Sequence, residues 1–180
     1  YVLGILGVNL VFPAYYYHHD VQAMIESLVD NLSVGSVEID LVRLQGPVFS
    51  NVNDRLVNLY LIAKGFSGAA IFDPEGKAHQ SKDILYKKDV MILRTRYNQK
   101  STPNFDLFNR AVEQFKRSQK VQDSDLIVLI EVLMPNVLDE VRELENSDLE
   151  KFAQRAEELC ATGNYVIVSN FTRNHKLAQY

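Results

Sequence analysis

Apolar residues recur along the chain in short blocks that predict a series of buried strands. Most of these blocks are near-continuous apolar runs, which is typical of parallel strands covered on both faces. In one block Val37, Ile39 and Leu41 alternate with polar residues, so that strand has a wetter side. The predicted strands are 2–12, 37–44, 68–73, 89–94, 124–132 and 165–169.

Between these blocks, apolar residues recur at spacings of three and four, which predicts amphipathic helices. Asp20 is a suitable N-cap for the first helix, and Gly65 is a suitable end for the second. Phe105, Phe108 and Phe115 belong to one buried stripe. The predicted helices are 20–33, 53–64, 81–86, one opening at Asn104, 148–161 and one opening near Thr172; residues 137–145 fit either a short helix or an insertion.

The alternation of strands and helices predicts an α/β fold, Rossmann-like, with a mostly parallel sheet and helices on both faces. We expect one domain over residues 1–180, in which two βαβαβ halves can be drawn, 2–73 and 89–169. The chain begins at Tyr1 rather than at a methionine. We therefore expect it to be a fragment of a longer protein.

Composition narrows the classes of protein that fit. The formal net charge is −4, which makes a nucleic-acid partner unlikely on charge grounds. The single Cys160 cannot form an internal disulfide, and this favours the cytoplasm or another reducing compartment such as an organelle matrix. No apolar run reaches the roughly 20 residues that span a bilayer, so no transmembrane segment is predicted.

In open α/β sheets, ligands bind beyond the carboxyl ends of the strands. The polar residues that follow each predicted strand are therefore candidates for a site, although helix caps and turns explain many such positions equally well. They are Tyr15 to Asp20, Gln45 and Gly46, Asp73, Arg94 to Asn104, Glu131 and Asn136, and Ser169 and Asn170.

The segment 94–104 combines cationic and hydroxyl residues where a strand turns into a helix. Unpaired N–H groups and the helix dipole attract anions there, so we expect a phosphate-facing loop. Each arginine has an alternative use, an ion pair with an acid at the sheet edge. The expected phosphate-facing residues are Arg94, Thr95, Arg96, Ser101, Thr102 and Asn104.

The stretch RTRYNQKSTPNFDLFNRAVEQF resembles the start of the adenylyltransferase branch of the nucleotidylyltransferase superfamily. There a strand ends in a Gly-Ser-Phe-Asn-Pro-like turn, and a Thr/His-x-x-His segment opens a helix. Thr95 and Arg96 stand at the Gly-Ser positions, Tyr97 at the Phe, and Ser101 and Asn104 at the two ends of the second pattern.

More broadly, HHD, EIDLVRLQGP, DRLVNL, LYKKDV and VSNF are similar to a bacterial family of uncharacterised, nicotinate-nucleotide adenylyltransferase-like proteins. The resemblance implies a nucleotide ligand, ATP with Mg²⁺, and adenylyl transfer where activity is kept. Thr95 replaces the glycine that admits a triphosphate, and Asn104 replaces a histidine that contacts it. These two changes imply weakened or lost activity, so no catalytic residue is assigned.

Other chemistries find little support. His18, His19 and Asp20 are adjacent, whereas zinc ligands are usually spaced two to four residues apart, so no metal site is predicted. The chain has no dinucleotide, Walker, nucleophile-elbow or zinc-peptidase motif. Two functions remain open: a nucleotide-binding protein of the adenylyltransferase type, and a non-catalytic structural or interaction subunit with protein partners.

Overall fold

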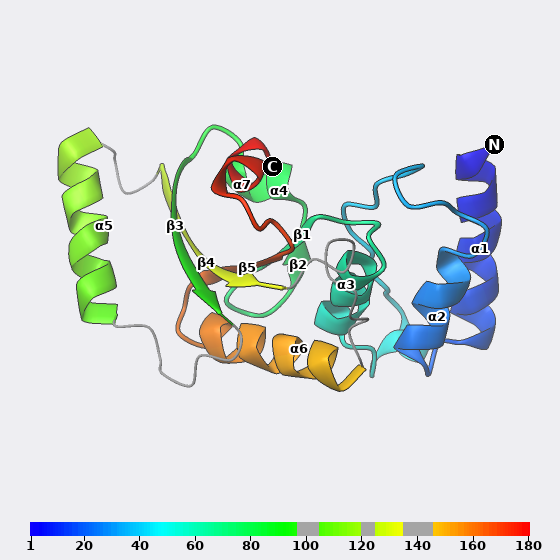
Figure 1. The fold of residues 1–180 in the computed structure, drawn as a ribbon. Coiled ribbons are helices and arrows are strands. Elements are labelled where there is room, and N and C mark those ends of the chain that lie inside the picture. The colour runs from blue at the N-terminus through cyan, green and yellow to red at the C-terminus, as the bar shows by residue number, and fades with distance from the viewer. Residues whose placement is uncertain (97–104, 120–124, 135–145) are drawn as a thin grey trace.

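The computed structural model describes residues 1–96, 105–119, 125–134 and 146–180, and it contains one five-stranded sheet flanked by helices (Figure 1). The strands stand in the order β2-β1-β5-β4-β3. Their bounds are Ala69–Phe72 for β1, Ala78–His79 for β2, Asp89–Arg96 for β3, Leu126–Leu133 for β4 and Tyr165–Ser169 for β5.

The sheet is mixed, so the fold is α/β as expected but the mostly parallel sheet is not confirmed. Strand β4 pairs in parallel with both β3 and β5. Strand β1 runs antiparallel to β5 and to β2. A tight turn explains the hairpin of β1 and β2, because antiparallel neighbours need only a short connection. In that turn the Gly76 N–H donates to Asp73 O at 2.8 Å, with Gly76 at φ 81°.

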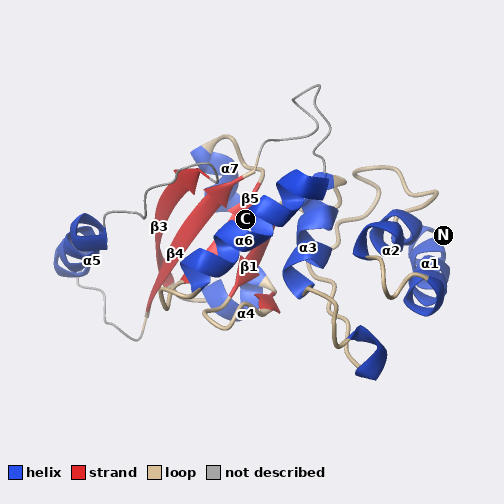
Figure 2. Cartoon of the chain, turned by 90° about the horizontal axis from the view of Figure 1, so that it is seen from below, coloured by secondary structure: helices blue, strands red, loops and turns tan. Residues whose placement is uncertain are grey.

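Helices cover both faces of the sheet (Figure 2). Helices α3 (Asp54–Ala63) and α6 (Asn146–Cys160) pack on one face, over a core that includes Phe72, Ile130 and Val166. Helices α4 (Ser81–Leu85) and α7 (Asn174–Gln179) cover the other face, over Ile71, Leu129 and Ile167. Residues 89–169 thus run β3, α5 (Phe105–Gln119), β4, α6, β5, with Phe108 of α5 buried.

The predicted first strand, 2–12, is wrong: this segment lies in helix α1 (Val2–Tyr16). An unbroken apolar run shows no period of its own, so it fits a buried strand and a helix equally well. The helix is fixed by its contact with α2 (Val21–Leu28). The Asn9 side-chain amide donates to Leu28 O at 3.1 Å and to Asp30 O at 2.7 Å. These are carbonyls at the end of α2, where no intrahelical donors remain.

The predicted strand at 37–44 is also wrong, although its alternation is real. Ile39 is half-buried between the exposed Glu38 and Asp40, as a strand would place them, yet no strand in the described ranges pairs with the segment. Instead of a neighbouring strand, the side chain of Asn58 on α3 pairs with the backbone of Val42. Its Oδ1 accepts from Val42 N–H and its Nδ2 donates to Val42 O, both at 3.0 Å.

Most local signals are confirmed. The Asp20 carboxylate caps α2 by accepting from Ala23 N–H at 3.0 Å, and the Asn53 side chain caps α3. Gly65 follows α3 with φ 76°. A three-residue 3₁₀ helix at Pro47–Phe49 lies in the connector before α3. The predicted cap Asn104 and the segment 137–145 lie outside the described residues.

Candidate functional site

Three adjacent parallel strands, β3, β4 and β5, end at the same edge of the sheet, which we call the carboxyl edge. Arg94 of β3 is paired in register with Glu131 of β4. Ser169 is the last residue of β5. Because side chains alternate along a strand, all three lie on the face that carries Leu129 and Ile167. The structure therefore brings together polar residues that follow three different predicted strands.

Arg94 and Glu131 form a bidentate ion pair within this group. Arg94 Nε lies 2.6 Å from Glu131 Oε2, and Arg94 Nη2 lies 3.1 Å from Glu131 Oε1. The Glu131 side chain is fully buried, and that of Arg94 is 29 % exposed. A planar guanidinium matches a carboxylate in this way with two parallel hydrogen bonds. The pair therefore satisfies a charge that would be costly to bury alone.

The rest of the cluster completes the shell of Glu131 and ties Arg94 to the chain after β5. The Ser169 hydroxyl donates to Glu131 Oε1 at 2.5 Å. Arg94 Nη2 donates to Phe171 O at 3.0 Å, and Nη1 donates to Thr172 O at 3.4 Å. Arg94 thus connects β3, β4 and the segment that leads into α7. We refer to Arg94, Glu131 and Ser169 as the carboxyl-edge cluster.

This geometry decides how Arg94 is used. Both candidate uses were open from the sequence, and the structure shows the ion pair with an acid at the sheet edge. Thr95 points to the opposite face and is buried at 6 % exposure. Arg96 ends β3. Ser101, Thr102 and Asn104, and the side chain of Arg96, lie outside the described residues.

Other candidates from the strand ends lie elsewhere. Asp73 directly follows β1, and because β1 is antiparallel to β5 it stands at the opposite edge of the sheet. Tyr15 to Asp20 span the end of α1 and the turn before α2, and Gln45 and Gly46 follow an irregular segment, so neither group marks a strand end. These placements correct the expectation that all such residues share one edge.

At the opposite edge Asp73 forms a pair with His79 that sequence spacing alone did not suggest. His79 Nε2 lies 2.6 Å from Asp73 Oδ2, and Asp73 Oδ1 accepts from Lys77 N–H at 2.8 Å. Burial raises the pKa of Asp73, but the hydrogen bonds from His79 and Lys77 outweigh it and hold that pKa below its usual value. The Asp-Pro-Glu-Gly turn signal would have found the pair, because a hairpin here brings residues 73 and 79 together.

The remaining chemically notable groups are spread over the molecule. His18 and His19 pack edge to face, with ring centroids 5.3 Å apart, and His18 Nδ1 lies 3.2 Å from Tyr15 O. Across the described ranges, no group of three or more His, Cys, Asp or Glu is placed to hold a metal ion. Burial raises the pKa of the Cys160 thiol to about 11, as expected of a core thiol rather than a nucleophile.

The fold and this cluster define an α/β protein whose mixed sheet ends in a buried, hydrogen-bonded ion pair. No model of a known protein family, no curated protein and no solved structure matches the chain. Within the part of the chain that the structure describes, no helix is both long and apolar enough to cross a membrane.

Proposed function

We propose that this protein binds a nucleotide or another phosphate-bearing ligand at the carboxyl edge of β3, β4 and β5. The observation that carries the proposal is the position of Arg94, which the ion pair with Glu131 holds at the carboxyl end of adjacent parallel strands. Ligands of open α/β sheets bind beyond such strand ends. A phosphate there would meet a strand end that a buried ion pair keeps in place.

The roles of the two arginines differ in this proposal. Three nitrogens of the Arg94 guanidinium are engaged with Glu131 and with the backbone of residues 171 and 172, so Arg94 positions the edge. Arg96, two residues further along β3, is the phosphate ligand. Ser101, Thr102 and Asn104 complete the phosphate-facing loop on the sequence argument, through hydroxyl groups and helix N–H groups, whereas the Thr95 side chain is buried on the opposite face of the sheet.

The resemblance to nicotinate-nucleotide adenylyltransferases supplies the ligand class. We infer ATP with Mg²⁺ as the nucleotide and adenylyl transfer as the reaction class in any active form. Thr95 and Asn104, in place of glycine and histidine, weaken phosphate contact and charge stabilisation at the phosphorus. We therefore propose weak binding with low or absent turnover. The lone, buried Cys160 suits a reducing compartment such as the cytoplasm or an organelle matrix.

Isothermal titration calorimetry with Mg·ATP, and with nicotinate mononucleotide, tests this proposal. The wild-type chain is expected to bind one of them with a Kd of about 1 mM or below. Arg96→Ala is expected to weaken binding about tenfold or more, because it removes a charge-assisted contact. Arg117→Ala, an exposed arginine on α5, is the matched control and is expected to bind as wild type does.

Two outcomes would contradict the proposal. Equal binding by wild type and Arg96→Ala removes Arg96 from the site. No binding by a folded wild-type chain at ligand concentrations of about 5 mM, well above the expected Kd, removes the nucleotide function. The second result favours the other candidate function, a non-catalytic interaction subunit.

The interaction subunit has its own supporting observation. Helix α1 is apolar on its outer side, and large side chains there are exposed, including Leu3, Val8, Val11 and Tyr15. A helix that is apolar all round is normally buried. The uncovered side of α1 therefore favours contact with another protein chain, and this contact does not depend on whether the carboxyl edge binds a nucleotide.

A further inference from the structure

Helix α1 forms one outer end of the molecule and packs only its inner side (Figure 1). Val2, Ile5, Leu6, Asn9 and Pro13 are half-buried or buried, at the spacing of one helical face. The two Asn9 hydrogen bonds to Leu28 O and Asp30 O fix this face against α2. The orientation of α1 is thus set by specific contacts, and its other side faces outward.

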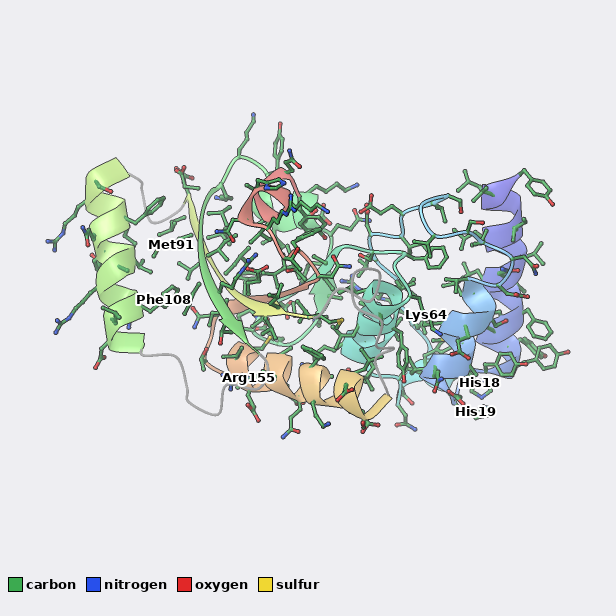
Figure 3. The ribbon with its side chains drawn as sticks, viewed as in Figure 1. His18, His19, Lys64, Met91, Phe108 and Arg155 are labelled. Carbon is green, nitrogen blue, oxygen red and sulfur yellow. The ribbon has the colours of Figure 1, made fainter. Side chains whose placement is uncertain are left out.

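The outward side of α1 carries an apolar surface without a charged residue. Leu3 is 75 % exposed, Val8 71 %, Val11 69 % and Tyr15 77 %. Leu10, Phe12 and Tyr16 extend this surface with about half of each residue exposed. In Figure 3, α1 lies at the right-hand end of the molecule, and side chains project from its outer side. We call these seven residues the α1 outer face.

We propose that the α1 outer face is the docking surface for α1 of a second copy of this chain, so that the protein is a homodimer. In such a dimer two α1–α2 hairpins pack through their outer helices about a two-fold axis, and the same surface serves on both copies. The inference rests on the surface of α1 alone and is independent of ligand binding at the carboxyl edge.

The size of the surface fits this partner. From the exposed fractions, the α1 outer face presents on the order of 800 Å² of mostly apolar area; this is the upper limit of what a partner can cover, and it is close to the contribution of each partner to a standard interface. Apart from the backbone of α1 itself, no described atom lies within 4 Å of the place where a Cβ would stand at Gly4 or Gly7. A second helix can therefore approach the α1 backbone closely at these positions.

The charge around α1 favours a second copy over a lipid surface. Residues 1–42 contain no lysine or arginine and five acids: Asp20, Glu26, Asp30, Glu38 and Asp40. Helices that lie on anionic membranes carry lysine and arginine beside their apolar face. The α1 helices carry no charged side chains of their own, so two of them can meet without like charges facing each other. Asp20 caps α2 in the turn after α1, and the other four acids lie on α2 or later in the chain.

Sedimentation velocity on the 180-residue chain tests the proposal, with Val8→Glu/Val11→Glu as the disrupting variant. Both side chains are exposed, so the double substitution leaves the core of the single copy intact. Tyr86→Glu is the matched control, because Tyr86 is a large, 70 % exposed residue at the end of α4, and α4 lies well away from α1 (Figure 1). Circular dichroism of all three proteins checks that they are folded.

The wild type is expected to sediment at twice its chain mass of 20.6 kDa. This should hold at about 100 µM chain, where a micromolar Kd leaves mostly dimer. The Val8→Glu/Val11→Glu protein should be a monomer, and Tyr86→Glu should remain a dimer. A monomeric wild type, or a dimer that the double variant leaves intact, would overturn the proposal.

A flotation assay with phosphatidylcholine vesicles tests the alternative that the α1 outer face binds a lipid surface. Under the proposal the wild-type dimer stays in solution, because the α1 outer face is already covered. A monomeric wild type that floats with the vesicles, and loses this binding in Val8→Glu/Val11→Glu, would overturn the homodimer and assign the surface to lipid.

Discussion

Arg94 and Glu131 stand side by side on two parallel strands, with Arg94 Nε 2.6 Å from Glu131 Oε2. Glu131 is fully buried, and its carboxylate depends on Arg94 and Ser169 for its hydrogen bonds. The pair fixes the carboxyl end of β3 and also holds the segment after β5 through the carbonyls of Phe171 and Thr172.

Arg94→Ala is expected to lower the free energy of unfolding, because it leaves the Glu131 carboxylate buried without its counter-charge. The cost should be about 3 kcal/mol, at the lower end for buried pairs because Arg94 is 29 % exposed. Urea denaturation followed by circular dichroism measures it. Arg117→Ala, on the exposed side of α5, should stay within about 0.5 kcal/mol of wild type. A variant as stable as its control would show that the pair does not support the fold.

Asn58→Ala is expected to destabilise the protein through the backbone of residues 37–44. The change removes both hydrogen bonds to Val42 and leaves the half-buried N–H and C=O of that residue without this partner. We expect a loss of about 1–3 kcal/mol, the range for polar groups that lose their hydrogen-bond partner on a folded chain. The comparison is Asn109→Ala, an exposed asparagine on α5, in the same urea titration. Equal midpoints for the two variants would contradict the role of Asn58 as a substitute for a strand partner.

The contacts of Arg94 and Asn58 show which features of the structure the sequence predicts and which it does not. Caps and periodic stripes predicted α3, β1, β4 and β5 closely, because those signals are local. Residues 37–44 alternate as a strand does, but their hydrogen-bond partner is the side-chain amide of Asn58 on α3, 16 residues beyond Val42. Such a contact depends on how α3 packs against the segment, and the alternation of apolar and polar residues does not predict that packing.

The prediction of a strand at residues 2–12 was wrong for a different reason. Their unbroken apolar run is compatible with both a buried strand and a helix. The hydrogen bonds of Asn9 to the end of α2 fix the helix. At the site, Glu131 and Ser169 were predictable as strand ends. The pairing of Arg94 required the register of β3 and β4, and the carbonyls of Phe171 and Thr172 are backbone groups that no residue type reveals.

Acidic pH should lower the free energy of unfolding through Asp73, which lies at the edge of the sheet opposite the carboxyl edge. Its pKa is lower in the folded than in the unfolded chain, so ionised Asp73 stabilises the native state above about pH 4, the ordinary Asp value. This contribution is lost as the pH falls through the lowered pKa. Asp73→Asn should therefore cost about 1.5–3 kcal/mol at neutral pH, as a hydrogen bond to a charged group does, and less in acid.

Urea titrations of wild type and Asp73→Asn at neutral and acidic pH measure this difference. Asp40→Asn, an exposed acid in the segment before α3, serves as the control and should behave as wild type at both. A difference between wild type and Asp73→Asn that does not shrink in acid would contradict the contribution of the Asp73 carboxylate.

Cys160 should resist thiol reagents while the protein is folded. It is 2 % exposed, and burial raises its pKa to about 11. At about pH 8 the thiolate fraction is then on the order of one in a thousand, and the thiolate is the reactive form. Ellman's reagent should label Cys160 slowly in buffer and rapidly in denaturing urea. Equal rates under the two conditions would place the thiol at the surface.

The most direct test of the proposed ligand site is amide chemical-shift mapping by NMR during a titration with Mg·ATP. Binding at the carboxyl edge predicts that the largest shifts fall on Thr95, Arg96 and residues 169–172, where β3 and β5 end. Shifts confined to the Asp73–His79 edge or to α1, or no shifts at about 5 mM ligand, well above a millimolar Kd, would contradict it.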